Sequence, residues 1–226
     1  MFRMNHIPIL YENDEIIVIN KPSGLAVQGG QGVTHSLDVD FSKELGYKIF
    51  LVHRLDKDTA GLMIVAKSAQ AANKWTKMIG AKDAKKEYIA ICAGSLKNKE
   101  GWIKESLVQH GIEKAASTFY QVEKEWDLLV EPPLEGQSES IKMSQIRLKL
   151  DTGRMHQIRI HLSKQGCPIA GDDQHGNFKI NKILKKQMKI KKLLLASVKL
   201  SLPVNNKEMV FEIPLPDYMQ FRANAL

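Results

Sequence analysis

Apolar and polar residues follow one another along this chain in short blocks. Two apolar runs, residues 49–52 and 62–66, are rich in Val, Ile and Leu and are bounded by turn residues, which is typical of buried strands. The same pattern predicts further strands at 15–20, 87–94, 102–108, 117–124, 128–130, 145–150 and 193–202. Apolar residues at helical spacing predict helices at 34–45, 68–79 and 156–164.

The strands outnumber the helices and come mostly in runs. This favours an α+β fold, with a mixed, mostly antiparallel sheet flanked by helices and loops. Ser68 is placed to cap the second helix, and Trp75 on its apolar side is expected in the core rather than as a platform for a base. Residues 131–136 predict a loop. The 226 residues contain no internal repeat, so we expect one domain, residues 1–226.

The connection between the runs 49–52 and 62–66 is unusually polar. Within six residues it contains five ionisable groups: His53, Arg54, Asp56, Lys57 and Asp58. Buried strands do not need such a connection, so the loop is a candidate for chemistry. An ordinary solvated turn is the alternative, because residues 58–61 are common turn formers. A calcium loop is excluded, since Ala60 and Lys67 stand where oxygen ligands are required.

A second polar concentration lies at residues 153–161, with the sequence GRMHQIRIH. His156 and His161 are five residues apart, which points them to different faces of a helix, and no third ligand is close. We therefore expect no metal site. Arg159 lies among apolar residues, so its guanidinium is expected to point inward. A buried, unpaired charge is costly, and this predicts a carboxylate partner, for which Asp56 is the natural candidate.

The overall charge is basic. A formal net charge of +8 fits a protein that meets polyanions, although simple solubility explains it as well. Residues 182–192 are lysine-rich, and both phosphate contacts and a solvated face remain open for them. The glycine-rich stretch 27–32 lacks a nucleotide-binding motif; it is either a flexible loop near a polymer substrate or a plain surface loop.

Cysteine usage and hydropathy indicate the compartment. Cys92 and Cys167 form neither a disulfide framework nor a CxxC motif, which indicates a reducing cytoplasm. No apolar run approaches the roughly 20 residues that span a bilayer. The amino terminus has acids too early for a secretory signal.

Several segments, in order, resemble the pseudouridine synthase family that has an HRLD signature and modifies ribosomal and transfer RNA. They are residues 19–27 (INKPSGLAV), 53–56 (HRLD), 59–61 (TAG), 86–90 (KEYIA), 153–161 and 166–176 (GCPIAGDDQHG). Together they cover about residues 7–215. The 29–32 loop and the Asp172–Asp173 pair are most similar to the C-type large-subunit enzymes. Ala60, His175 and the absence of a His before Ala196 depart from the family pattern.

The resemblance implies the pseudouridine synthase fold and the isomerisation of uridine, which needs no cofactor and no metal. It implies Asp56 as the catalytic carboxylate, Tyr88 packed on a flipped uracil, and Arg159 orienting the carboxylate through charge-assisted hydrogen bonds. From the strand pattern alone, Tyr88 is instead a half-buried aromatic residue. The RNA-binding residues that we expect are His53, Arg54, Thr59, Lys21, Arg154, His156, Lys85 and Lys86, with Arg54 filling the space that the flipped base leaves.

The expected partner is RNA, with 23S ribosomal RNA favoured as substrate. A transfer-RNA or dual-specificity synthase is one alternative, and a weakly active RNA-binding protein of ribosome assembly is another. A methyltransferase is disfavoured, because its nucleotide fingerprint is missing. The S4-type RNA-binding domain of close relatives does not occur among these residues, which leaves selection of the RNA site open. We expect a monomer, in the cytoplasm, with no membrane, metal or cofactor.

Overall fold

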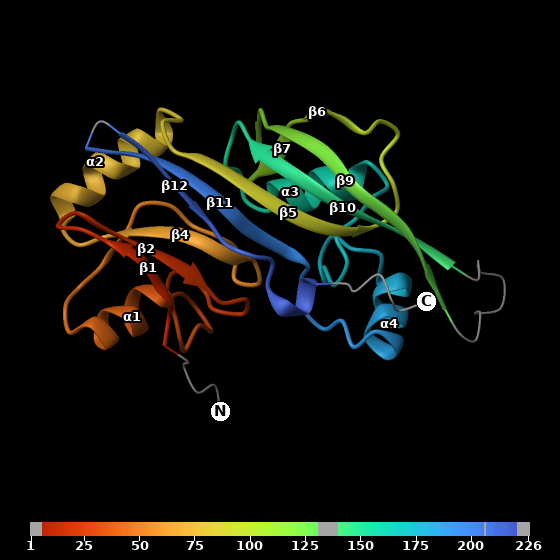
Figure 1. Ribbon diagram of the computed structural model, residues 1–226, viewed down its shortest axis with the longest axis horizontal. Coiled ribbons are helices and arrows are strands. Elements are labelled where there is room, and N and C mark those ends of the chain that lie inside the picture. Colours follow the sequence, from red (N-terminus) through yellow and green to blue (C-terminus); the bar gives the residue numbers. More distant parts are fainter. Residues whose placement is uncertain (1–5, 131–139, 206, 221–226) are drawn as a thin grey trace. The chain divides into compact units, whose positions relative to one another are not determined.

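The apolar runs predicted as strands form strands in the computed structural model, which describes residues 6–130, 140–205 and 207–220. The chain divides into two units, residues 1–86 with 196–214, and residues 87–195 with 215–226 (Figure 1). It passes from the first unit to the second within β5 (Lys85–Ala93) and returns at the start of β11 (Leu195–Val204). The predicted 131–136 loop lies outside the described residues, and the single domain stays a prediction.

The first unit is a mostly antiparallel sheet with two helices. Its strands follow the order β1-β2-β4-β11-β12, and β3 pairs with β4. Only the pairing of β4 with β11 is parallel among the described pairs of this unit. Besides β11, its elements are β1 (Ile9–Glu12), β2 (Ile16–Lys21), α1 (Leu37–Leu45), β3 (Phe50–Leu51), β4 (Ala60–Ala66), α2 (Ala69–Gly80) and β12 (Lys207–Glu212).

The core of this unit joins the sheet to α2. Ala71 and Trp75 of α2 pack with the buried residues of β2, β4 and β11, and Trp75 is 1% exposed. The indole nitrogen of Trp75 donates a hydrogen bond to Glu15 Oε2 at 3.0 Å. The predicted core position of Trp75 is therefore confirmed. Ser68 caps α2 as predicted, because its hydroxyl accepts a hydrogen bond from the Ala71 N–H at 3.1 Å.

Gly61 of β4 lies opposite Ser197 of β11, with the two backbones close together. Its φ angle is +111°, and a Cβ added there would lie 2.1 Å from the Ser197 carbonyl oxygen on β11. A side chain would have to push the two backbones apart. Gly61 follows the polar loop by a few residues, so this close approach helps to fix where the loop ends.

Gly61→Ala is expected to lower the free energy of unfolding by about 3 kcal/mol, because both the positive φ and the backbone contact oppose a Cβ. Urea denaturation measures the change. Gly80→Ala is the matched control: it lies in α2 with no atom within 4 Å of the added Cβ, and should raise stability by up to about 1 kcal/mol. A Gly61→Ala variant as stable as the wild type would contradict this packing.

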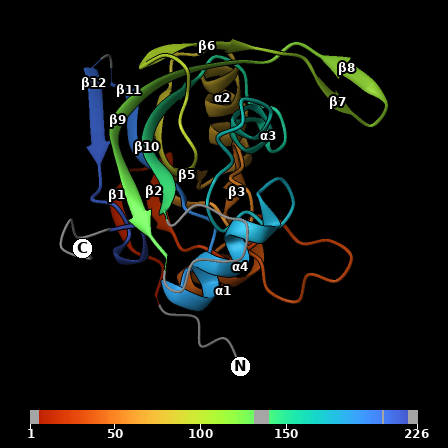
Figure 2. The same cartoon turned by 90° about the vertical axis from the view of Figure 1, so that its right-hand side faces the viewer.

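The second unit has a sheet of long antiparallel strands in the order β5-β10-β9-β6, and a separate pair, β7 and β8. Figure 2 shows the β7–β8 hairpin extending away from the sheet of this unit. Besides β5, its elements are β6 (Glu100–Lys104), β7 (Leu107–Gln109), β8 (Ile112–Lys114), β9 (Ser117–Leu129), β10 (Ser140–Leu150), α3 (Gln157–Lys164), α4 (Phe178–Gln187) and a 3₁₀ turn (Asp217–Met219).

Two sequence predictions need correction in this unit, and one stretch without a predicted element is helical. The strands predicted at 117–124 and 128–130 are one strand, β9, because pairing with β10 continues through the polar residues between them. The strand predicted at 102–108 is two strands, since β6 pairs with β9 whereas β7 pairs with β8. The lysine-rich stretch contains a helix, α4, which Asn177 caps through its side chain. The α+β prediction itself is confirmed, and no described helix is long and apolar enough to cross a membrane.

Candidate functional site

The polar loop of the first unit connects β3 to β4 and contains Asp56. The Asp56 side chain is half-buried, and its backbone carbonyl accepts a hydrogen bond from the Thr59 N–H at 3.1 Å. Arg54 and Lys57 are exposed. The loop is therefore a closed turn that presents two partly buried carboxylates, of Asp56 and Asp58, between the exposed cations of Arg54 and Lys57.

The turn after β2 fixes this loop by donating hydrogen bonds to the backbone carbonyls of the loop. The Lys57 carbonyl accepts hydrogen bonds from the Gly24 N–H at 2.9 Å and from Lys21 Nζ at 3.0 Å. The Ser23 hydroxyl donates to the Asp58 carbonyl at 2.8 Å. These contacts are independent of the side chains of Lys57 and Asp58, so the turn sets the path of the loop without occupying its polar groups.

Lys21 is fully buried under this turn. Its ammonium group donates to the carbonyls of Pro22 and Leu25, at 2.9 and 2.8 Å, in addition to that of Lys57. Each of the three N–H groups of the ammonium thus has one carbonyl acceptor. Burial lowers the pKa of Lys21 to about 7, while the charges of Asp58 and Asp56 raise it. The predicted contact of Lys21 with RNA is therefore not supported, because the side chain is 0% exposed.

Lys21 makes stability depend on pH. Between about pH 7 and 10.4 an unfolded lysine keeps its proton, whereas the buried amine releases it. The unfolded chain then binds more protons, so raising the pH favours the folded state, by up to about 1.4 kcal/mol per pH unit. Below about pH 7 both states are protonated and this dependence ends.

The difference in unfolding free energy between wild type and Lys21→Met should therefore grow as pH rises from 7 to 10. Urea denaturation at several pH values measures it. Lys57→Met, which removes an exposed side chain of the same loop, should give a difference that is flat with pH. A flat difference for Lys21→Met as well would show that its ammonium is not held in a low-dielectric site.

Two further predicted RNA-binding residues also have internal roles. Nε2 of His53 accepts a hydrogen bond from the Ile64 N–H of β4 at 3.0 Å. Burial lowers the pKa of His53 well below its ordinary value, and the charge of Lys86 lowers it further. His53 is thus neutral at pH 7. Thr59 is 2% exposed, so its side chain is not accessible for a direct RNA contact, whereas an RNA contact by half-buried His53 stays a prediction.

Lys85 and Lys86 lie at the start of β5. Lys85 is exposed and lies 3.5 Å from Glu208. Burial lowers the pKa of Lys86 to about 8, so most molecules still have this charge at pH 7. Both lysines remain predicted phosphate contacts, and exposed Arg54 remains predicted to fill the space that the flipped base leaves.

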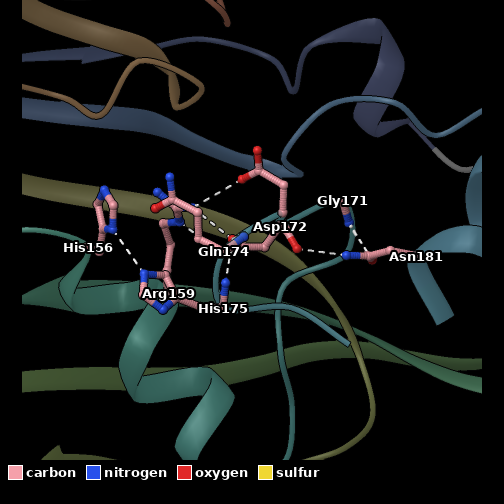
Figure 3. Close-up of polar contacts among 8 residues, drawn as sticks. His156, Arg159, Gly171, Asp172, Gln174, His175 and Asn181 are labelled. Carbon is pink, nitrogen blue, oxygen red and sulfur yellow. Dashed lines mark hydrogen bonds and ion pairs between the residues drawn. The ribbon is translucent and has the colours of Figure 1, made fainter. Parts of the chain in front are cut away.

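In the second unit, Arg159 is buried and paired. Its Nε and Nη2 donate to Asp172 Oδ2 and Oδ1 at 2.8 and 2.7 Å (Figure 3). The exposed fractions are 4% for Arg159 and 1% for Asp172. The predicted inward guanidinium with a carboxylate partner is confirmed, and the partner described is Asp172. A pairing with Asp56 would join residues of the two units and stays a prediction.

Asp172 is itself held by the loop that follows it. Its Oδ1 accepts hydrogen bonds from the N–H groups of Gln174 and His175, both at 3.0 Å. These bonds and Arg159 lower the pKa of Asp172 against the effect of burial. The carboxylate is therefore ionised at neutral pH. The sequence marked Asp172 only as part of the Asp172–Asp173 pair; the signal for its internal role is its position two residues after the buried Ala170.

The other predicted residues of this unit are close in sequence to Arg159 or lie on β5. Tyr88 is buried on β5, opposite Leu148 of β10. Arg154 is half-buried and donates to the Ala115 carbonyl at 3.3 Å. His156 precedes α3 in a left-handed conformation, with Nδ1 2.9 Å from Nε2 of His175. RNA contacts by Arg154 and His156 stay predictions.

The second histidine of the motif is structural. His161 lies within hydrogen-bonding distance of Thr118 Oγ1 and of the Glu105 carbonyl, at 2.9 and 3.0 Å, and burial lowers its pKa. His161 and His156 have different hydrogen-bonding partners, so the two imidazoles do not point to a common metal ion. Among the residues that the structure describes, no cluster of three or more His, Cys, Asp or Glu side chains is arranged to hold a metal ion.

Comparison with known proteins identifies related chains. Residues 15–164 match the family model described as RNA pseudouridylate synthase. The chain is 33% identical to ribosomal large subunit pseudouridine synthase C of Rickettsia bellii, over 93% of this chain and 69% of that protein. It is 30% identical to ribosomal large subunit pseudouridine synthase D of Haemophilus influenzae, over 100% of this chain and 73% of that protein.

Two solved structures are similar to this chain in fold. The structure of human RNA pseudouridylate synthase domain containing 4 superposes with a TM-score of 0.69 and 26% identity, over 93% of this chain and 89% of that one. Human RNA pseudouridylate synthase domain containing 1 gives a TM-score of 0.70 at 21% identity, over 92% and 83%. The second likeness concerns the fold alone.

Proposed function

The chain belongs to the RNA pseudouridylate synthase family, and from this premise we propose that it isomerises specific uridines of 23S ribosomal RNA to pseudouridine. The observation that supports this most is the position of Asp56. It lies inside the matched region, in a loop whose backbone carbonyls accept hydrogen bonds from the side chains of Lys21 and Ser23. The relatives named as large-subunit ribosomal RNA enzymes support the choice of substrate.

The reaction breaks the bond between uracil N1 and ribose C1′, turns the base and joins C5 to C1′. Nothing is oxidised or reduced: the proton on C5 leaves at the end and N1 is protonated, so product and substrate are isomers. In our proposal, Asp56 is the carboxylate that acts at C1′, either by attacking it or by assisting the departure of uracil. A fixed loop suits this role, because an oriented group loses less entropy on reaching the transition state.

The target uridine must leave its stack before Asp56 can reach it. Flipping a base costs a few kcal/mol. Exposed Arg54, two residues before Asp56, is proposed to occupy the vacated space. Tyr88 is proposed to pack on the flipped uracil, and Arg159 to orient reacting groups by its charge. Lys85 and Lys86 are proposed phosphate contacts.

The direct test uses RNA labelled with tritium at C5 of uridine. Purified chain should release tritium from 23S ribosomal RNA, and pseudouridine should appear at discrete positions when the product is mapped. Transfer RNA serves as the second substrate in parallel. Release from transfer RNA alone would move the substrate to that class, and release from neither would overturn the proposal.

A further inference from the structure

Helix α4 of the second unit has an outer side made of lysines. Its inner side is apolar, with Ile183 and Leu184 buried. Lys182, Lys185 and Lys186 are exposed on the outside. We call these three residues the α4 lysine face. Lys179 precedes it in the first turn of the helix, and exposed Lys189, Lys191 and Lys192 follow it.

The exposed side of α4 differs from that of an ordinary solvated helix, because its charges are all positive. Solvated helices usually mix signs, because like charges three or four residues apart repel. Lys182 has such neighbours in both Lys185 and Lys186. The sequence contains no Asp or Glu between Asp173 and Glu208, so the segment supplies no neutralising charge of its own. Lys179 adds a cation at the end of the helix where the macrodipole favours an anion.

We propose that the α4 lysine face binds the phosphate backbone of RNA outside the target nucleotide. This inference rests on the proposed function and names a second contact with the same substrate. A polyanion supplies the negative charge that this segment lacks. A lipid surface fits less well, because Ile183 and Leu184 are buried against the protein and leave Phe178, 64% exposed, as the large apolar side chain of α4 that could enter a membrane.

The test is the salt dependence of RNA binding by the full chain. The triple variant Lys182→Gln, Lys185→Gln, Lys186→Gln should reduce the slope of log K against log salt by about 2 to 3, since each phosphate contact contributes about 0.7 to 0.9. The same positions changed to Arg should keep the slope. Exposed Lys43, Lys77 and Lys97, changed together to Gln, should keep it as well.

An unchanged slope in the α4 Gln variant, or an equal loss in the control triple, would overturn the proposal. Binding to phosphatidylserine vesicles that only the α4 variant loses, with the RNA slope unchanged, would assign the face to lipid and overturn it too. Binding is measured without turnover, so a failure of the proposed reaction is seen separately, in the tritium assay.

A second inference concerns how Arg159 is held. Besides its bonds to Arg159 and to the following loop, Asp172 is fixed through its backbone. Asn181 of α4 donates from Nδ2 to the Asp172 carbonyl at 2.7 Å and accepts from the Gly171 N–H at 2.9 Å (Figure 3). Gly176 leaves room for this contact, because a Cβ there would lie 2.2 Å from the Asp172 carbonyl oxygen.

From this geometry we infer that Asp172 is a positioning residue for Arg159. The two parallel hydrogen bonds fix the plane of the guanidinium as well as its place, which a single contact would not do. The neighbouring Asp173 cannot do the same, since it is 79% exposed and lies 3.8 Å from Arg159. This inference also rests on the proposed function, in which Arg159 orients reacting groups.

Asp172→Asn should lower kcat for pseudouridine formation by about 100-fold, while KM for RNA changes less than about threefold. The NH₂ group of the new amide would face an N–H group of Arg159, so one of the two hydrogen bonds would be lost. Asp173→Asn makes the same chemical change one residue away and should alter kcat less than about threefold. The NMR resonance of the Arg159 Nε–H can be identified by its loss in Arg159→Lys. This resonance should shift in Asp172→Asn and keep its position in Asp173→Asn.

Asn181→Ala provides a second route if Asp172→Asn does not fold. It loosens the Asp172 backbone without touching the ion pair and should lower kcat about tenfold. Wild-type kcat in folded Asp172→Asn, or equal losses in both aspartate variants, would overturn the inference. If the wild type shows no turnover, the proposed function fails, yet the resonance still tests whether Asp172 fixes Arg159.

Discussion

Asp56→Asn is expected to lower the release of tritium from 5-tritiated uridine RNA by about 10³-fold or more, because the amide can neither attack C1′ nor stabilise positive charge there. The fold should survive. Asn has nearly the shape of Asp, the side chain is only half-buried, and the contact from Thr59 is made to the backbone carbonyl. Circular dichroism and thermal unfolding check the fold alongside the activity.

Asp58→Asn is the matched control for this variant. Asp58 is half-buried in the same loop, and the Ser23 hydroxyl binds its backbone carbonyl, which the substitution leaves in place. Its turnover should stay within about tenfold of wild type. Retained turnover in Asp56→Asn, or equal losses in both variants, would remove Asp56 from the chemistry.

Arg159→Ala is expected to lower the free energy of unfolding by about 3 to 5 kcal/mol, because it leaves the carboxylate of Asp172 buried without its cation. The loop N–H groups of Gln174 and His175 remain, but they do not supply a full positive charge. Urea denaturation at pH 7 measures the loss. The expected effect is independent of any role in catalysis.

Arg154→Ala is the comparison for this variant, since Arg154 lies in the same motif but is only half-buried, with a 3.3 Å contact to a carbonyl. It should cost no more than about 1 kcal/mol. The double variant Arg159→Met, Asp172→Leu should recover much of the loss, because it removes both buried charges together. A double variant as unstable as Arg159→Ala would show that the loss comes from packing, or from the Gln174 and His175 N–H groups that lose their acceptor, and not from the unpaired charge.

Residue types and spacing were sufficient to predict the polar loop. An apolar run on either side defines β3 and β4, and the charged residues between them cannot all be buried, so the loop had to turn at the protein surface. The same logic placed Trp75 in the core and Ser68 at a helix cap. These features depend on neighbours within a few residues of each other in the chain, where local geometry decides.

The sequence was a poorer guide where distant segments meet. Lys21 has the composition of an RNA contact but is buried, because carbonyls from two separate turns surround its ammonium. The helix α4 went unrecognised among its lysines, since its apolar side is narrow. Strand β9 continues through a polar stretch because β10 supplies its hydrogen bonds. Each outcome depends on a partner that lies far along the chain.

By itself, the sequence determined the α+β class, the loop with Asp56, the inward direction of Arg159 and the resemblance to an RNA-modifying family. The tertiary structure alone decided that Asp172 is bound to Arg159 and that Lys21 has an internal role. The physical reason is that a buried charge requires a partner, which a sequence can state, while the identity of that partner depends on which backbones meet, which only the folded chain specifies.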